Sequence, residues 1–431
     1  MPPVIGLDFG TTNSAIAVST PDGPTTLATF AGNGYRTTTF RSVLYFDPDM
    51  RTPDRKPRAI AGPGAIDSYL KADTRGRLMQ SMKSHLASRL FRDTYVFGTK
   101  YTLEDLIAII VRELRAAAEA QFGDLGGKVV VGRPVHFSGA GSAEEDAFAL
   151  GRLRAALQQA GFDEIVFEYE PVAAAYEFES QLDHDELILI ADFGGGTSDF
   201  SLMQVGPSVR GRGHTADDIL GTDGVAIAGD IFDSKIVRHA VAPRLGQGSA
   251  YRSAFNKVLP VPAWLYTHLE RWHYLSFLKS KKTLQMLTEL RLQAFEPEKI
   301  AALMHVIEHD LGYHLYRAVE QTKIELSGRE ASVLAFSDVA LSIEQSVRQG
   351  QFEDWVAEEV AAIAACLDRL LAQTGVTPGD VGSVFMTGGS SFVPAVRHLF
   401  ETRFGAARIR SGGELTSVAK GLALRALDLH G

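Results

Sequence analysis

Two segments of the chain share one pattern, in which a short apolar strand ends in an Asp-Phe-Gly turn rich in Gly, Thr and Ser. Residues 4–14 read VIGLDFGTTNS, and residues 187–199 read LILIADFGGGTSD. A second, alternating strand follows each turn, so both segments predict β-hairpins. Because one hairpin lies in each half of the chain, the pattern predicts two related lobes, each with a similar turn at the end of a buried strand.

The residues of these turns indicate phosphate binding. Glycine adopts positive φ without a steric penalty, so consecutive backbone N–H groups can converge on an anion, and Thr hydroxyls add further donors. Asp8 and Asp192 end the two buried strands and would bring two carboxylates near the same anion. Such an arrangement repels phosphate unless a divalent cation lies between them, and Mg²⁺, which keeps most of its water, suits this role. The alternative is that each is an ordinary hairpin turn, since Asp-x-Gly and Gly-Gly are frequent turn sequences; the second copy argues against it.

Length and composition restrict the remaining possibilities. The 431 residues are too many for one compact core and fit two domains of about 200 residues each. The formal net charge of −9 argues against non-specific nucleic-acid binding. Cys366 is the one cysteine, so an intramolecular disulfide is excluded, and its apolar helical context predicts a small buried side chain. Without a basic leader or a long apolar run, we expect no signal peptide, no membrane partner and a cytoplasmic protein.

The order of predicted elements indicates an α/β fold. Thr102 begins an amphipathic helix that ends before Gly123, and the second half of the chain repeats the hairpin before a long helical stretch. The other expected elements are strands at 128–133, 165–167 and 384–386 and helices at 148–160, after Glu170-Pro171, at 230–327 and at 352–373. Strands that alternate with helices are typical of a mixed sheet covered by helices.

A third glycine-rich turn follows the strand at 384–386, where Thr387-Gly388-Gly389-Ser390-Ser391 leads into a helix. In a doubly wound sheet such a turn offers a helix N-terminus to a polar ligand. The chain contains neither a G-x-x-x-x-G-K-[ST] P-loop nor a G-x-G-x-x-G dinucleotide fingerprint. Those two phosphate-binding mechanisms are therefore excluded.

Taken together, the motifs resemble those of the DnaK-type heat-shock chaperone ATPases, relatives of actin and hexokinase. Residues 8–14, 192–199 and 388–390 resemble the first phosphate, second phosphate and adenosine motifs of that family. The similarity covers nearly the whole chain, and within the family the chain is most similar to the short, truncated members typified by the bacterial YegD proteins.

The resemblance implies an actin-like ATPase fold with two ribonuclease-H-like lobes, each carrying an inserted subdomain, and a nucleotide cleft between them. We expect lobe I at 1–186, with its insertion at about 35–100. We expect lobe II at 187–431, with an insertion at about 230–327 that is expanded at about 245–300. Because the chain ends at Gly431 without a β-rich substrate-binding domain, we also expect that ATP is not coupled to peptide clamping within this chain.

The resemblance also assigns roles to residues. It implies that Lys83 reaches the γ-phosphate and that Glu170, supported by Asp199, orients the attacking water. Asp8 and Asp192 would hold Mg²⁺ largely through water. The phosphates of ATP or ADP would be bound by Gly10, Thr11, Thr12, Asn13, Gly194, Gly195, Gly196 and Thr197, of which Thr197 also belongs to the catalytic set. The adenosine would be bound by Glu320, Lys323, Ser327, Gly388, Gly389, Ser390 and Phe392.

One departure concerns the base. The family commonly places adenine between two arginine side chains, and the matching positions here are Ile324 and Phe392. An aliphatic and an aromatic side chain can still hold a base, because base–aromatic stacking contributes about 1–3 kcal/mol. The base preference is left open by the sequence.

The expected function is that of a Mg-dependent, chaperone-like ATPase, which hydrolyses ATP slowly and couples nucleotide state to lobe closure and to a protein partner. A small-molecule kinase of the same superfamily, a non-catalytic nucleotide-responsive module and a filament-forming protein stay as alternatives.

Two other patterns in the sequence carry less weight. His305, Glu308 and His309 match a zinc-peptidase pattern, but five-residue matches arise by chance. The aromatic side chains within 264–277 suggest core packing of the expanded segment more than a docking surface.

Overall fold

The computed structural model describes residues 3–21, 23–32, 35–71, 76–179, 182–212, 215–271, 275–309, 311–411 and 416–430. The chain forms two compact units. The first comprises Met1–Ala228, Ala362–Ser391 and His398–Gly431, and the second comprises Gly229–Ala361 and Phe392–Arg397. Both large sheets belong to the first unit, so the expected lobe boundary after residue 186 stays a prediction. Among the described residues, no helix has both the length and the apolar composition that crossing a bilayer requires.

The first sheet of unit 1 contains the first predicted hairpin. Its strand order is β13-β12-β1-β2-β3, and β6 also pairs with β2. The strands are β1 (Val4–Phe9), β2 (Asn13–Ser19), β3 (Thr26–Leu27), β6 (Phe40–Arg41), β12 (Lys128–Arg133) and β13 (Glu164–Tyr169). β1 and β2 are antiparallel, whereas β12 and β13 run parallel to β1. The hairpin at 4–14 is thereby confirmed as the centre of a mixed sheet.

Two helices pack on this sheet through one hydrophobic core, α2 (Leu103–Phe122) and α3 (Ala143–Gln159). α2 begins as predicted, because Thr102 and Asp105 form a capping box in which each side chain accepts a hydrogen bond from the other residue's backbone N–H. Leu106 and Ile110 of α2 are fully buried in the same core as Leu7 of β1. α3 begins earlier than predicted, after the N-cap Ser142, because that cap fixes its start.

The second sheet contains the second predicted hairpin, and its strand order is β16-β15-β14-β21-β22. The strands are β14 (Glu186–Phe193), β15 (Ser198–Val205), β16 (Ile219–Val225), β21 (Ser383–Thr387) and β22 (Ile409–Ser411). β14 and β15 are antiparallel, and β21 runs parallel to β14 with Asp192 beside Thr387. The third glycine-rich turn therefore leaves the sheet next to the second one. Short helices adjoin these strands in the sequence: α5 (Pro207–Arg212), η2 (Ala216–Asp218), η6 (Gly389–Phe392), α13 (Pro394–Phe404) and η7 (Ala406–Arg408). The stretch Phe392–Arg397, at the end of η6 and the start of α13, belongs to unit 2.

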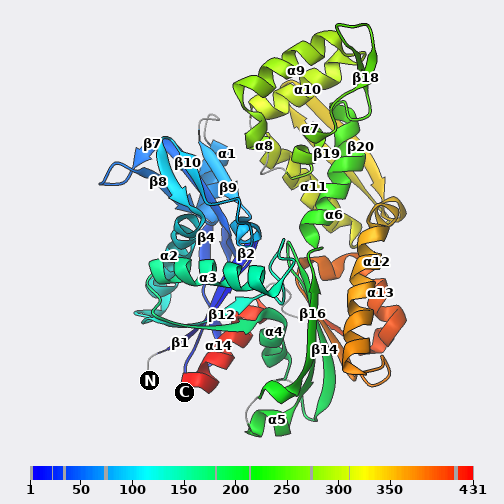
Figure 1. Ribbon diagram of the computed structural model, residues 1–431. Coiled ribbons are helices and arrows are strands. Elements are labelled where there is room, and N and C mark those ends of the chain that lie inside the picture. Colours follow the sequence, from blue (N-terminus) through cyan, green and yellow to red (C-terminus); the bar gives the residue numbers. More distant parts are fainter. Residues whose placement is uncertain are drawn as a thin grey trace. The chain divides into compact units, whose positions relative to one another are not determined.

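Helices α4 (Glu170–Glu179) and α14 (Ser417–His430) share a core with strands of both sheets (Figure 1). Val130 of the first sheet, Ile190 of the second and Leu422 of α14 all belong to it. The two helices touch at Gly421, where an added Cβ would lie 1.7 Å from the Ala173 carbonyl oxygen. This close approach joins the two sheets into one unit.

The region at 35–100, expected to be an insertion, folds as short strands and helices within unit 1. They are β5 (Tyr35–Thr37), β7 (Val43–Arg51), β8 (Pro57–Ala61), α1 (Pro63–Lys71), β9 (Arg77–Gln80), η1 (Met82–His85), β10 (Asp93–Val96) and β11 (Thr99–Thr102). β4 (Phe30–Gly32) precedes the region and pairs with β5. β8, β7 and β9 form a three-stranded sheet. η1 follows β9 after one residue and carries Lys83. Through Lys83, this region supplies a cation to the rest of unit 1.

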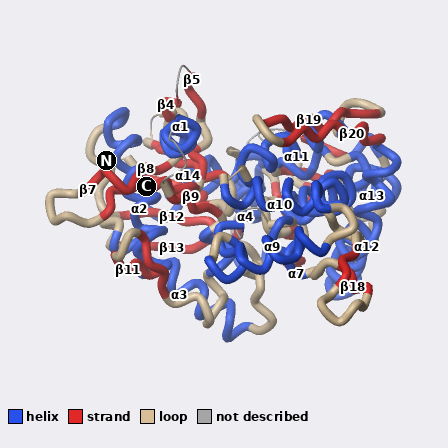
Figure 2. The backbone as a smooth tube through the Cα atoms, turned by 90° about the horizontal axis from the view of Figure 1, so that it is seen from above, coloured by secondary structure: helices blue, strands red, loops and turns tan. Residues whose placement is uncertain are grey.

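Unit 2 is mostly helical. Its elements are α6 (Gly229–Ile236), η3 (Val237–Val241), η4 (Ala242–Leu245), β17 (Ala250–Arg252), β18 (Val258–Pro260), α7 (Trp264–Leu269), α8 (Leu275–Leu278), α9 (Lys281–Gln293), α10 (Pro297–Glu308), α11 (Gly312–Leu326), β19 (Ala331–Asp338) and β20 (Leu341–Arg348). α9 and α10 lie side by side (Figure 2). α12 (Gln349–Thr374) begins in this unit and ends in the first.

The continuous helical stretch expected at 230–327 is wrong, because the hairpin β17–β18 interrupts it. Its turn is closed by the bond from the Ser253 N–H to the Lys257 carbonyl, and Asn256 takes the left-handed conformation with φ 58°. Tyr266 is buried, as core packing predicts, whereas Trp264 is exposed. Trp272 and Tyr274, also part of the aromatic pattern, lie outside the described residues. Cys366 is buried as expected.

Candidate functional site

The two Asp-Phe-Gly turns face each other within unit 1. A Cβ added to Gly196, in the turn between β14 and β15, would lie 3.5 Å from the Thr11 Oγ1 of the other turn. It would also lie 3.7 Å from the Ser84 Oγ of η1. Residues far apart in the sequence, at 11, 84 and 196, therefore meet at one place, where the glycine leaves room for a group that a side chain would exclude.

The first turn is fixed by a small serine network. The Gly10 N–H donates to the Ser14 Oγ over 3.2 Å, and the Ser42 hydroxyl donates to the Gly10 carbonyl over 2.7 Å. The Ser42 N–H donates to the Thr12 carbonyl over 2.9 Å. These bonds hold the backbone around Thr11 and Asn13 in one conformation. Ser42 lies outside the turn motif, so no sequence pattern pointed to it.

The second turn is closed by the bond from the Gly194 N–H to the Thr197 carbonyl, 2.9 Å long. The Thr197 side chain hydrogen-bonds to the Asp199 carboxylate. Asp192 and Asp199 stand opposite each other on β14 and β15. Gly388, with φ 81°, starts the third turn so close to β14 that an added Cβ would lie 2.0 Å from the Phe193 carbonyl oxygen. The second and third turns thus form one continuous edge of the sheet, along which Gly195, Gly389 and the buried Ser390 also lie.

Lys83 and Glu170 form a buried ion pair between the region around η1 and the first residue of α4. The distance from Lys83 Nζ to Glu170 Oε1 is 2.5 Å, and the two side chains are 8% and 9% exposed. Burial lowers the pKa of Lys83, but Glu170 and Asp8 raise it, and the net direction is upward. Lys83 is therefore a permanent cation in this site.

Carboxylates outnumber cations around this pair. Burial, followed by repulsion from Glu170, raises the pKa of Asp8 to about 7, and Lys83 opposes the shift. Burial and Glu170 also raise the pKa of Asp199 to about 7, and the bonds from Thr197 and the Val135 N–H oppose it. The pKa of Asp192 lies well above its usual value for the same leading causes, with Asp199 and Asp8 adding repulsion. One lysine is not enough to neutralise four acids, of which Glu170, Asp192 and Asp199 are buried and Asp8 is half-buried.

This charge excess fits a divalent cation. Among the described residues, no three His, Cys, Asp or Glu side chains are arranged to bind an ion directly. An ion bound between Asp8 and Asp192 would therefore keep much of its own water, which is the coordination that Mg²⁺ favours. The excess of carboxylates is compatible with Mg²⁺, and its binding by Asp8 and Asp192 stays a prediction.

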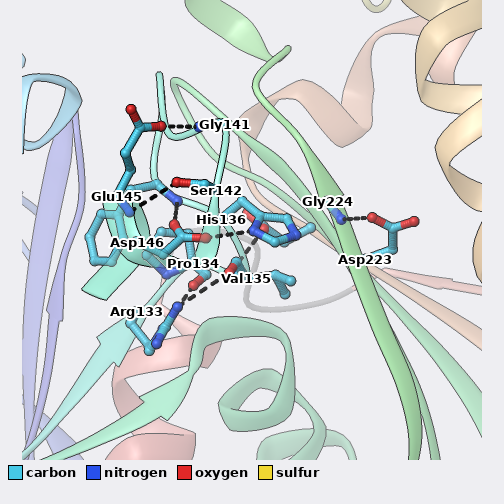
Figure 3. A network of polar contacts seen from close by, with 12 residues as sticks. Arg133, Pro134, Val135, His136, Gly141, Ser142, Glu145, Asp146, Asp223 and Gly224 are labelled. Atoms are coloured by element: carbon cyan, nitrogen blue, oxygen red, sulfur yellow. Dashed lines mark hydrogen bonds and ion pairs between the residues drawn. The ribbon is translucent and has the colours of Figure 1, made fainter. Parts of the chain in front are cut away.

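Sequence reasoning missed the loop after β12, whose polar contacts from Arg133 to Asp146 are shown in Figure 3. The Val135 N–H donates to Asp199 Oδ1 over 3.0 Å. On one side, the Arg133 guanidinium donates to the Pro134 and Val135 carbonyls over 3.1 and 3.3 Å. On the other, buried Asp146 accepts from the Phe137 N–H and bonds to His136 Nδ1. A backbone donor leaves no residue signature, so only the Pro that stops β12 hinted at this loop.

The residues expected at the adenosine are divided between the units. Gly388, Gly389 and Ser390 belong to unit 1, whereas Glu320, Lys323, Ser327 and Phe392 belong to unit 2. Within unit 2, Lys323 Nζ lies 2.8 Å from Asp233 Oδ2, and the Ser327 hydroxyl bonds to the Lys323 carbonyl. The Ile324 and Phe392 side chains are 57% and 47% exposed. Both apolar side chains are thus available to a ligand, and Asp233 is a partner of Lys323 that the sequence did not reveal.

The histidines of the zinc-peptidase pattern are used differently. His305 Nε2 lies 2.6 Å from Asp338 Oδ2, and the rings of His305 and His309 are 4.3 Å apart. His305 is therefore engaged with a carboxylate at the end of β19. This contact gives the histidine a structural role that needs no metal.

Comparison with protein families identifies one matching family model. The family model described as Hsp70 protein matches residues 4–245 and 306–431. The matched ranges include both hairpins, η1, α4, α11 and the third turn, and they omit the segment 246–305. Together with the two mixed sheets and their helices, this match confirms the actin-like ATPase fold. It also confirms the resemblance drawn from the motifs, while the finer likeness to YegD-like members stays a prediction. The chain belongs to the Hsp70 family.

Proposed function

We propose that this chain binds Mg·ATP at the two facing turns and hydrolyses it slowly. Family membership supports a chaperone-type, ATP-binding ATPase. The observation that carries the proposal for this chain is the convergence of Thr11, Ser84 and Gly196 beside the buried pair of Lys83 and Glu170. Donors for an anion and a buried acid–base pair are what phosphoryl transfer to water requires.

The residues divide the work by their chemistry. Lys83 neutralises charge on the terminal phosphate, and when it turns toward that phosphate the Glu170 carboxylate becomes available to accept a hydrogen bond from water. The Thr197 hydroxyl and the Val135 N–H hold Asp199 in place and favour its charged form, whereas burial and Glu170 raise its pKa overall to about 7. Thr11, Thr12 and the glycines of the second turn donate to phosphate oxygens. Mg²⁺ between Asp8 and Asp192 would neutralise part of the phosphate charge.

ATP turnover by the full chain with Mg²⁺ tests the proposal. We expect a low basal rate that falls at least about tenfold in Lys83→Ala and in Thr197→Ala, because each change removes a group facing the reacting phosphate. Lys56→Ala is the matched control, since Lys56 is exposed and pairs with Asp54. Pooled metabolites are added in a parallel reaction.

Each alternative gives a different result. Metabolite-dependent turnover would favour a small-molecule kinase. Nucleotide binding without turnover would favour a passive nucleotide-responsive module. Unchanged turnover in both variants would contradict the proposed site.

We further propose that nucleotide state controls lobe closure and, through it, the binding of a protein partner. The family supports nucleotide and client binding in general. The existence of a protein partner, the dependence on Mg²⁺ and the cytoplasmic location are predictions for this chain.

A further inference from the structure

The segment 246–305, which the family match omits, carries an uncovered apolar surface. Among its described residues, six large hydrophobic side chains are exposed: Phe255, Val258, Leu259, Trp264, Leu292 and Phe295. Phe255, at the turn of the β17–β18 hairpin, is 88% exposed, and Leu292, at the end of α9, is 78% exposed. Exposed apolar side chains are ordinary when scattered, but a group on one small element indicates a contact surface.

Strand register places several of these side chains on one face. Arg252 pairs with Val258 and Ala250 with Pro260, so these four residues share a face of the hairpin. Tyr251 pairs with Leu259 and also bridges to Ala294, which places them on the opposite face. Phe295 follows Ala294, and its N–H donates to the Ala250 carbonyl over 3.0 Å. It therefore lies on the first face, which we call the insert face: Arg252, Val258, Pro260 and Phe295.

Arg252 is held in place on this face. Its guanidinium lies 5.6 Å from the centre of the Phe295 ring, and its Nη1 donates to the Asn256 Oδ1 over 2.8 Å. An arginine fixed on an aromatic ring loses little side-chain freedom when it binds. Aromatic and arginine side chains are also the residues that dominate binding energy in protein interfaces.

Charge identifies the kind of partner. The hairpin at 249–261 contains Arg252 and Lys257 and no acidic residue. The whole segment 246–305 has eight Lys or Arg residues against four Asp or Glu residues, although the full chain has 43 against 52. A basic, apolar surface on an acidic chain complements an acidic, apolar ligand.

The hairpin favours a protein segment over a lipid surface. Anionic membranes are recognised by clusters of about four to eight Lys or Arg side chains, whereas this hairpin has two, and the other six of the segment lie outside the hairpin. The face, not the strand edge, is the docking element. The outward backbone groups of β18 come from Val258 and Pro260, and proline has no N–H to offer an added strand.

We propose that the insert face and Phe255 bind an acidic, amphipathic segment of another protein. Apolar side chains of the segment pack on Val258, Phe295 and Phe255, and its carboxylates pair with Arg252 and Lys257. This surface lies outside the residues proposed to bind ATP, so the two proposals stand or fall separately.

Fluorescence anisotropy with labelled synthetic peptides tests this. Two acidic peptides are used, with Leu and Phe at every second position or at helical spacing and Glu elsewhere, beside matched peptides with Lys for each Glu. We expect the full chain to bind at least one acidic peptide about tenfold more tightly than its Lys counterpart. The double change Phe255→Ser and Phe295→Ser should weaken binding about tenfold. The double change Arg252→Glu and Lys257→Glu should reverse the preference between Glu and Lys peptides.

Controls separate this surface from general stickiness and from misfolding. Val339→Ser, at a fully exposed position of the same unit, should leave peptide binding unchanged. All these side chains are exposed, so every variant should keep the wild-type thermal transition and ATP turnover. Failure to bind either acidic peptide, or binding that ignores peptide charge, would overturn the proposal. Binding of the full chain to vesicles of phosphatidylserine in phosphatidylcholine would also overturn the proposal. Self-association of the chain would overturn it too, if the association disappears in the Phe255→Ser, Phe295→Ser variant while peptides do not bind.

Discussion

At the residue scale, the pair of Lys83 and Glu170 is asymmetric in its surroundings. Lys83 faces Glu170, Asp8 and Asp199, which all raise its pKa. Glu170 is itself the leading source of repulsion, after burial, on Asp8, Asp192 and Asp199. The two partners therefore contribute differently to stability even though they share one ion pair.

The first prediction follows from this asymmetry. Lys83→Met leaves the buried acids without their cation and should lower the melting temperature by several degrees, since unpaired buried charge costs about 3–5 kcal/mol. Glu170→Gln removes repulsion among the acids and should lower it less or raise it. Both variants should lose turnover. Differential scanning calorimetry without nucleotide compares them, and a larger loss in Glu170→Gln would contradict the charge assignment.

The second prediction concerns pH in the metal-free protein. The pKa of Asp199 is raised to about 7 in the folded chain, so between about pH 4 and 7 the folded state holds a proton that the unfolded state has released. Stability should therefore decrease as pH rises through this window, by up to about 1.4 kcal/mol per pH unit from this group. Asp199→Asn should flatten that slope. Urea denaturation in EDTA between pH 5 and 8 measures it, and a wild-type stability that rises through the window would contradict the prediction.

At the element scale, the close contact between α4 and α14 joins the two sheets of unit 1. Gly421 is the position where the helices meet, because a Cβ there would overlap the Ala173 carbonyl. Helix α4 also begins with Glu170, so the same contact fixes the element that carries a proposed catalytic residue. Displacement of α14 should affect both stability and the site.

The third prediction tests this contact. Gly421→Ala should destabilise unit 1 by about 1–3 kcal/mol or more, because the helices must move apart. Gly151→Ala on α3 is the matched control, since a Cβ there meets nothing within 4 Å and alanine favours a helix by about 1 kcal/mol. Chemical denaturation of the two variants measures the change in the free energy of unfolding that each substitution causes. Equal effects would mean that α14 adapts to the added methyl group.

At the scale of the whole molecule, the proposed ligand links separate parts of the chain. The facing turns come from the two sheets of unit 1. A ligand that contacts both turns stabilises the folded chain by mass action. The effect requires only that the ligand binds the folded state.

The fourth prediction therefore concerns the effect of Mg·ATP on the thermal stability of the protein. Mg·ATP at about 100 times its dissociation constant should stabilise the protein by about 2.7 kcal/mol, and EDTA should abolish most of the shift. Lys83→Ala should reduce the shift, whereas Phe255→Ser should retain it. Scanning fluorimetry measures all four conditions. A shift that survives EDTA unchanged would contradict the role of the cation.

The local elements of this protein could be predicted from short stretches of sequence. The Asp-Phe-Gly segments form the expected hairpins, and Thr102 caps the expected helix, because strand alternation and helix capping depend on residues close together in the chain. The β17–β18 hairpin was missed. Its turn depends on the left-handed backbone of Asn256, not on a Gly or Pro that would have marked it.

The candidate site also has features that short stretches of sequence predict and features that they do not. The sequence by itself determined which residues could bind phosphate and a cation, because Gly, Thr and Asp have that chemistry in any turn of this kind. Only the tertiary structure decided that Gly196 meets Thr11 and Ser84, that Asp199 is held by the Val135 N–H, and that Lys83 lies against Glu170. These contacts join residues up to 185 positions apart, as Thr11 and Gly196 are, and one is made by a backbone group that has no letter in the sequence. Packing of two sheets around α4 and α14, and not any local pattern, brings them together.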